Sequence, residues 1–269
     1  AGAGILTRMA YAQDGADSAF QAAKADAEET AERVKELARA PTGIPATGAL
    51  TLLRSDPLVQ GPRIFASSCA SCHRFDGHDG LGGTPTDSAS APDLKGFASR
   101  EWLEGFLDPE RIETDEYFGG TAFARTRMVR FVTRNVANYD AEQQVGLESV
   151  IAALAAEAAL PTQIDADSSL IATGRAMMSD SIINCTRCHA FYEAGREDPV
   201  GPDLTGYGSR QWLLDFMEDP AHPRFYGDRN DRMPAFGADG VLSEQDSGLV
   251  GDWLREEWYR DTAAPEPGS

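Results

Sequence analysis

All four cysteines of this chain lie in two copies of one five-residue pattern, and this feature constrains the fold more than any other. The first copy is CASCH at residues 69–73, and the second is CTRCH at residues 185–189. In each copy two thiols lie three residues apart, on one turn of backbone, and a histidine follows directly. No cysteine remains for a separate disulfide or for a free nucleophile.

Cys-x-x-Cys-His is the attachment signature of c-type haem. The two thiols form thioethers to the vinyl groups of one porphyrin, and the adjacent imidazole binds the iron as the proximal ligand. The sequence therefore predicts two covalently attached haems as cofactors. The residues predicted to hold them are Cys69, Cys72, His73, Cys185, Cys188 and His189.

Three other interpretations of the pattern are open. A thioredoxin-like redox motif needs no histidine and requires a βαβ context, which neither copy has. A zinc site could take thiolates and imidazoles from both copies together, although the copies lie far apart in the sequence. Two disulfides are the third alternative. Two complete copies in one chain favour haem over all three.

An internal repeat surrounds the two motifs. PDLKGFASREWL begins at Pro92, and PDLTGYGSRQWL begins at Pro202. Each copy continues with an Asp-Pro pair, a loop rich in Tyr, Phe and Gly, an Arg-Met pair and an amphipathic segment. The same order of haem motif, turn, helix, Met loop and terminal helix is thus expected twice.

A helix is expected before each motif. Gly61 and Phe65 lie one helical turn apart in the first copy, and Gly174 and Met178 do so in the second. A small residue at this place would let the terminal helix cross closely.

Local signals also predict where the later helices begin. Ser99 and Ser209 are expected N-caps of the SREWLEGF and SRQWLLDF helices. Asp140 and Ser243 open the terminal helices with a capping-box pattern, because Gln or Asp follows three residues later.

The methionine of each Arg-Met pair is the predicted second axial ligand, because thioether sulfur is a soft neutral donor that stabilises Fe(II). Met233 is followed by Pro234, which fixes the direction of a ligand loop. Met128 occupies the equivalent place after His73, but Val129 replaces the proline. We predict Met128 for the first haem and Met233 for the second, and expect any departure from Met/His coordination at the first.

Other donors are few. His78 lies only five residues after His73 and cannot easily reach the opposite haem face. His222 is expected on a loop or surface. Met177 and Met178 are expected to pack in the core.

The chain resembles two fused mono-haem cytochrome c domains of the common all-helical type, over roughly residues 55–260. PDLTGYGSRQWLLDFMEDPAHPRFYG and the later DRMPAFG are more specifically similar to the dihaem c subunits, or cytochrome b-fused c domains, of bacterial quinol:cytochrome c oxidoreductases (the bc-type complexes). The resemblance implies an all-α fold with a few helices around each haem. It also implies cytochrome b and iron–sulfur subunits as partners.

Four parts are expected along the chain. Residues 1–45 form an N-terminal helical segment or a linker to an anchor, and residues 50–160 and 165–260 form two cytochrome c domains. Residues 261–269 form a disordered tail. DSAFQAAKADAEETAERVKELARA predicts one helix that ends before Pro41. We expect membrane association through a segment or subunit outside this chain.

Composition limits the partners. The formal net charge of −19 argues against nucleic acid, which requires stripes of Lys and Arg. It favours a redox partner with a basic docking face, although a generally solvated acidic surface is the alternative. No apolar run of about 18 residues or more could span a bilayer. Because c-type haem is attached outside the cytoplasm, we expect a periplasmic location.

Two classes of function fit these observations. An electron carrier would relay single electrons from a respiratory or photosynthetic quinol-oxidising complex to a downstream acceptor, without chemistry of its own. A dihaem enzyme, such as a cytochrome c peroxidase, would need one iron with an open position. A methionine in both copies and few histidines outside the motifs favour the carrier. The cytochrome subunit of a dehydrogenase would be the same relay with another donor.

Overall fold

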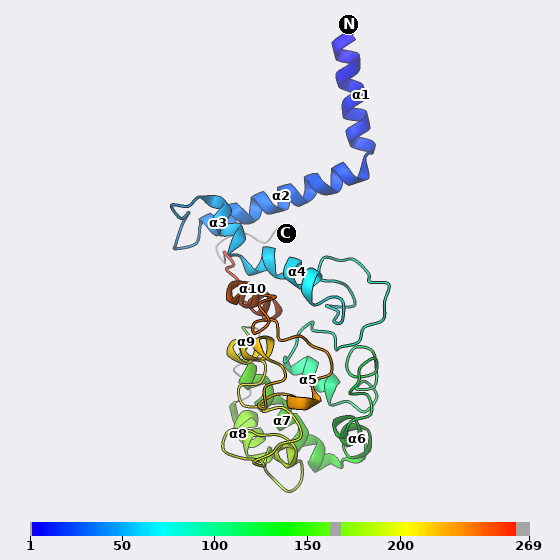
Figure 1. Ribbon diagram of the computed structural model, residues 1–269, viewed down its shortest axis with the longest axis vertical. Coiled ribbons are helices and arrows are strands. Elements are labelled where there is room, and N and C mark those ends of the chain that lie inside the picture. Colours follow the sequence, from blue (N-terminus) through cyan, green and yellow to red (C-terminus); the bar gives the residue numbers. More distant parts are fainter. Residues whose placement is uncertain (1, 162–167, 262–269) are drawn as a thin grey trace. The chain divides into compact units, whose positions relative to one another are not determined.

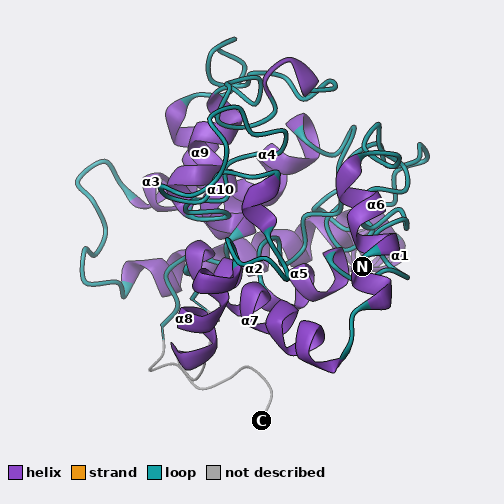
Figure 2. Cartoon of the chain, turned by 90° about the horizontal axis from the view of Figure 1, so that it is seen from below, coloured by secondary structure: helices purple, strands orange, loops and turns teal. Residues whose placement is uncertain are grey.

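The computed structural model describes residues 2–161 and 168–261 of the chain (Figure 1). Every regular element in these two stretches is a helix, and long irregular loops join the helices (Figure 2). The predicted all-α class is therefore confirmed. Apart from Asp261, the predicted disordered tail lies outside the described residues.

The chain divides into two compact units, one made of residues 1–59 with the segment from 259 onward, the other of residues 60–258. The first unit contains α1 (Gly2–Ala16), α2 (Ser18–Ala38) and α3 (Ala49–Arg54). The carboxylate of Asp17 caps α2 by accepting hydrogen bonds from the first backbone N–H groups of that helix. The predicted N-terminal helix, ending before Pro41, is confirmed.

A buried ion pair holds α2 within the first unit. The Nε of Arg33 lies 2.8 Å from Oδ2 of Asp56, and one of its terminal nitrogens lies 2.7 Å from Oδ1. Both side chains are buried, and the bidentate geometry satisfies both carboxylate oxygens. The same guanidinium donates to the carbonyl of Tyr259, which fastens the returning chain to α2.

The second unit carries both haem motifs. Its helices are α4 (Pro57–Ser68), α5 (Arg100–Phe106), α6 (Arg127–Arg134), α7 (Ala141–Ala158), α8 (Ser168–Met177), α9 (Arg210–Glu218) and α10 (Glu244–Leu254). The first three residues of α4 belong to the first unit. Short 3-10 turns lie at Val136–Asn138, Cys185–Arg187 and Gly227–Arg229.

The predicted helix starts of the second unit are confirmed. The hydroxyls of Ser99 and Ser209 accept hydrogen bonds from the backbone N–H groups of Trp102 and Trp212. Full capping boxes open α7 at Asp140 and α10 at Ser243. Local sequence thus determines where these helices begin.

The helices before the motifs cross the terminal helices closely, as predicted, but each crosses the terminal helix of the other copy. A Cβ on Gly61 of α4 would lie 2.2 Å from Cβ of Trp253 in α10. A Cβ on Gly174 of α8 would lie 1.8 Å from the carbonyl oxygen of Ser149 in α7. The repeat has therefore exchanged its terminal helices.

Two buried clusters follow this exchange. The Phe65 cluster joins the first motif region to the second half of copy two and consists of Phe65, Ala70, Trp212, Leu213, Met217, Phe225, Val250, Trp253 and Leu254. The Val150 cluster joins the second half of copy one to the second motif region. It consists of Trp102, Leu103, Leu107, Ile112, Tyr117, Phe118, Val129, Val132, Val136, Leu147, Val150, Ile151, Leu154, Ala155, Met178, Ile183, Phe191 and Leu204.

The two copies cross at Ala98 and Gly208. Both residues have a left-handed backbone, with φ of 63° and 72°, and a Cβ on Gly208 would lie 2.2 Å from Cβ of Ala98. Buried Arg255 donates to the carbonyls of Gly208 and Ala158, at 2.6 and 2.7 Å. These contacts therefore join segments of both predicted ranges, 50–160 and 165–260.

Two candidate haem sites

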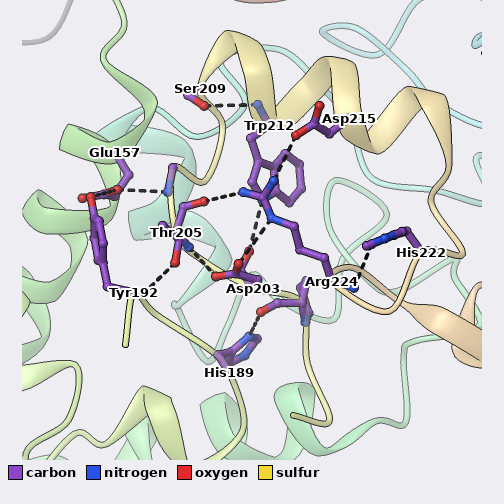
Figure 3. A network of polar contacts seen from close by, with 12 residues as sticks. Glu157, His189, Tyr192, Asp203, Thr205, Ser209, Trp212, Asp215, His222 and Arg224 are labelled. Atoms are coloured by element: carbon purple, nitrogen blue, oxygen red, sulfur yellow. Dashed lines mark hydrogen bonds and ion pairs between the residues drawn. The ribbon is translucent and has the colours of Figure 1, made fainter. Parts of the chain in front are cut away.

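Each motif histidine is oriented by a proline of its own copy. Nδ1 of His73 lies 2.8 Å from the carbonyl oxygen of Pro92. Nδ1 of His189 lies 2.8 Å from the carbonyl oxygen of Pro202 (Figure 3). A carbonyl can only accept, so Nδ1 carries the proton in both rings. The remaining nitrogen, Nε2, is then free to bind a metal.

The surroundings of both rings favour the neutral imidazole, which is the form that binds metals. Burial lowers the pKa of His73 and of His189. The second ring is tightly enclosed, since a Cβ on Gly201 would lie 2.4 Å from Cε1 of His189. The first copy has Ala91 at the equivalent place.

The cysteines lie on the turn that leads to each histidine. The N–H of His73 donates to the carbonyl of Cys69 at 2.9 Å, and the N–H of His189 donates to that of Cys185 at 3.0 Å. Burial raises the pKa of the first thiol of each motif, Cys69 and Cys185, to about 12. Each motif thus presents protonated sulfur next to a fixed imidazole.

The alternatives of disulfides and a shared zinc site have no counterpart in the described residues. There, all four cysteines are free thiols. Within the same ranges, no group of three His, Cys, Asp or Glu side chains could hold a bare metal ion.

A polar network fixes the PDLTG turn behind His189 (Figure 3). The guanidinium of Arg224 pairs with Asp203 at 3.3 Å and with Asp215 at 2.9 Å, and it donates to the carbonyl of Thr205 at 3.0 Å. The indole of Trp212 donates to the carbonyl of Asp203. These contacts hold α9 against the segment that orients the histidine.

Glu157, at the end of α7, reaches this turn from the first copy. Its side chain is only 3% exposed, and its carboxylate accepts from the N–H of Gly206 at 3.0 Å and from the hydroxyl of Tyr192 at 2.8 Å. Arg175 pairs with the other oxygen at 2.9 Å. The terminal helix of copy one therefore supports the proximal turn of copy two.

Met233 lies on an irregular segment between the 3-10 turn Gly227–Arg229 and α10. The Nδ2 of Asn230 donates to the carbonyl of Met233 at 2.9 Å, which fastens the segment next to Pro234. The side chain is partly buried and packs against the Phe65 cluster, as does Cys69. Met233 therefore lies outside the helices, as predicted. The haem motif that packs on the same Phe65 cluster, however, is the first motif and not the second.

Met128 lies in α6 instead of a loop. It is the second residue of that helix, and the buried Val129 and Val132 anchor the helix in the core. The partly buried Met128 side chain packs against the Val150 cluster, as does Cys185. Our pairing of Met128 with His73 and of Met233 with His189 therefore differs from the packing, because the terminal helices are exchanged.

The other candidate donors lie where the sequence predicts. His222 is exposed on the loop after α9. Nδ1 of His78 accepts a hydrogen bond from the N–H of Gly80, beside the ring of Phe75. Met178 is fully buried in the core.

Three tyrosines near the sites were missed by the sequence analysis. The hydroxyl of Tyr139 is buried with no hydrogen-bond partner in the described part of the chain, and burial, with a smaller contribution from Cys185, raises its pKa. Burial raises the pKa of Tyr226 to about 12, and that of Tyr207 far above its usual value. Of the three, Tyr207 could have been found from the repeat, because it stands at the position where copy one has Phe97.

Comparison with known families identifies part of the chain. Residues 58–147 match the family model described as Cytochrome c. This stretch, about a third of the chain, is similar to cytochrome c. It contains the first motif and Met128, and the similarity supports covalent c-type haem and haem-based electron transfer. Neither the curated proteins nor the solved structures gave a significant match.

The residues of both sites fit a covalent haem. Each cluster is packed by the first cysteine of one motif, by a partly buried thioether and by an aromatic wall. The same motif adds a second free thiol and an imidazole with a free Nε2. The orphaned hydroxyl of Tyr139 in the Val150 cluster also marks a place where a further group would complete the packing. Of the described helices, none is both long and apolar enough to cross a membrane.

Proposed function

We propose that the protein is a dihaem c-type cytochrome that relays single electrons. The observation that carries this proposal is the equivalence of the two motifs, whose histidines make the same 2.8 Å contact to a proline carbonyl. The second motif, outside the residues that match the cytochrome c family, is thus built like the first. The proposed haem-binding residues are Cys69, Cys72, His73, Met128, Cys185, Cys188, His189 and Met233.

When bound, each haem would supply one-electron iron chemistry. The protein's part is to attach and orient it. The cysteines would hold the porphyrin edge, and the proline carbonyls would keep both imidazoles in the tautomer that presents Nε2. The thioethers of Met128 and Met233 would favour the ferrous state over the ferric state.

Aromatic packing between the two clusters supports a relay. Phe97 and Tyr207 each pack against both clusters, and their ring centroids lie 5.4 Å apart. Trp102 lies 4.9 Å from Phe97, and Trp212 lies 5.0 Å from Tyr207. Because tunnelling through packed atoms is more efficient than tunnelling across gaps, this row would couple the two haems.

A dihaem enzyme such as a cytochrome c peroxidase is less well supported. That function needs an acid or base beside an open iron. Both clusters instead hold a methionine, and the two histidines outside the motifs are an exposed loop residue and a residue whose Nδ1 accepts a backbone hydrogen bond. The cytochrome subunit of a dehydrogenase is the same relay with a different electron donor.

The resemblance to bc-type complexes suggests the partners. We propose cytochrome b and iron–sulfur subunits on the donor side and an acceptor with a basic face, on the periplasmic side of a membrane. The net charge of −19 supports steering of a basic partner and argues against nucleic acid. Any attachment to the membrane would come through a segment or subunit outside this chain.

Absorption spectra test the proposal. The purified holoprotein should contain two haems by pyridine haemochrome assay, and its oxidised form should show the weak red Met–Fe(III) band at two-haem intensity. Met128→Ala and Met233→Ala should each remove half of that band. High-spin ferric haem at one site in the unmodified protein would overturn the relay and favour the enzyme.

A further inference from the structure

We infer that the two haems have crossed axial ligands. Met233 binds the iron of the haem that is attached to Cys69 and Cys72 and ligated by His73. Met128 binds the iron of the haem that is attached to Cys185 and Cys188 and ligated by His189. This inference rests on the proposed function, because it concerns the pairing of ligands within two Met/His haems. Each haem is then completed by both copies of the repeat.

The helix crossings place the first motif against the terminal helix of the second copy. Gly61 and Phe65, just before the first motif, pack on Trp253 of α10, with ring centroids of Phe65 and Trp253 5.5 Å apart. Phe75, just after the motif, stacks on the same indole at 4.2 Å. The first motif is therefore enclosed by the terminal helix that follows Met233 in the sequence.

The second motif shows the mirror arrangement. A Cβ on Gly146, near the start of α7, would lie 3.0 Å from Sδ of Met177 and 3.5 Å from Cδ1 of Ile183. These two residues lead into Cys185. The helix that follows Met128 in the sequence thus packs against the approach to the second motif.

Tyr139 links Met128 to the core around the second motif. It lies between α6, which carries Met128, and α7. Its ring packs edge-on against Phe131 of α6, with ring centroids 6.5 Å apart. Met128, Tyr139 and Cys185 all pack against the Val150 cluster, so the segment from Met128 to α7 shares its core with the second motif.

The place of the exchange explains why the proline contacts are not crossed. The two copies of the repeat cross at Ala98 and Gly208, just after the PDL segments. Arg255 stabilises this crossing by donating a hydrogen bond to the carbonyl of Gly208. Everything before the crossing, including the histidine and its proline, stays with its own copy. Everything after it, including the methionine, belongs to the opposite cluster.

Nuclear magnetic resonance of the intact, fully reduced holoprotein tests the pairing. Ferrous six-coordinate haem is diamagnetic, and the ring current moves the methyl of an axial methionine far upfield. With 13C-methyl methionine, nuclear Overhauser effects lead from this methyl to the protons of its own haem. From the thioether bridges they continue to the cysteine β-protons.

We expect the methyl of Met233 to connect to the haem of Cys69 and Cys72, and the methyl of Met128 to the other haem. A connection from Met233 to the haem of Cys185 would overturn the crossing and leave the proposed function intact. Absence of upfield methionine methyls would overturn Met/His coordination itself, and the pairing with it. Either Met128→Leu or Met233→Leu alone suffices for assignment, since the remaining signal belongs to the other methionine.

Discussion

The two Arg-Met segments occupy equivalent places in the repeat but have different structures. RMVRFV lies in α6, whereas RMPAFG is irregular and is held by Asn230. Pro234 has no N–H and a fixed φ, and it disfavours helical backbone at Met233. Val129 can continue a helix, and its burial together with Val132 stabilises that helix. The two methionines therefore occupy equivalent places in the repeat although the backbone around them differs.

The supports of the two proximal turns differ as well. Glu157 is buried and accepts three hydrogen bonds around the PDLTG turn, whereas Glu256 pairs with Lys95 of the PDLKG turn on the surface, at 3.1 Å. The turn of the second motif thus has a buried carboxylate from the other copy. The first motif is supported instead by the buried Arg74, which donates to the carbonyls of Ala70 and His73, and by the aromatic packing of Phe65 and Phe75 on Trp253.

The largest effects should appear at the helix crossings of the two clusters. Gly174→Val should lower the free energy of unfolding by about 3 kcal/mol or more, because its Cβ would meet a backbone carbonyl that cannot move aside. Gly61→Val should also be strongly destabilising, because its Cβ would lie 2.2 Å from Cβ of the buried Trp253, an atom that the backbone of α10 fixes. Urea unfolding followed by circular dichroism measures both.

Gly251→Ala is the matched control for these variants. Its Cβ would make only ordinary contacts, 3.7 Å or more from Met217 and Leu214, so stability should be unchanged or slightly increased. Equal stability of Gly174→Val and the unmodified protein would contradict the close crossing of α7 and α8.

The buried carboxylate should matter more than the exposed one. Glu157→Ala leaves the N–H of Gly206 without its acceptor and should cost about 1–3 kcal/mol of unfolding free energy. Glu256→Ala, which removes the surface pair with Lys95 of the PDLKG turn, should change stability by less than about 1 kcal/mol. Equal losses in the two variants would show that the supports are equivalent after all.

Asn230 should act as a positioning residue for Met233. Asn230→Ala removes one hydrogen bond, worth about 1 kcal/mol, and should lower the temperature at which half of the Met–Fe(III) band disappears. Asn138→Ala is the control. It also removes one hydrogen bond to a backbone carbonyl, that of Arg134, but this carbonyl does not belong to a methionine, so the band should be unchanged. A general loss of stability with an unaltered band would refute the positioning role.

The smallest effect should be at alkaline pH. Burial raises the pKa of Tyr226 to about 12, above the ordinary value of 10.0, so the folded protein holds this proton more tightly than the unfolded chain. That stability is fully present below the unfolded pKa and is lost as pH rises through the folded pKa. Tyr226→Phe places at this position the residue type that copy one has at Phe118. It should therefore raise the pH at which the protein unfolds in base. The exposed Tyr11→Phe should not, and circular dichroism during base titration measures both.

Much of the local structure follows from short stretches of sequence. Ser99, Ser209, Asp140 and Ser243 cap helices as predicted, because a cap needs only its own side chain and the next turn of backbone. The spacing of each motif likewise places two thiols and an imidazole together without help from the rest of the chain. The helix around Met128 could not be predicted in this way, since it depends on burying Val129 and Val132 in the Val150 cluster.

By itself, the sequence determined the motifs, the repeat, the all-α class and the glycines at the helix crossings. Only the tertiary structure decided which terminal helix crosses which glycine. The two copies carry similar apolar faces, so either pairing buries the same kind of surface, and no local pattern distinguishes them. The decision depends on contacts distant in sequence, with Ala98 against Gly208 and Arg255 on the carbonyls of Gly208 and Ala158.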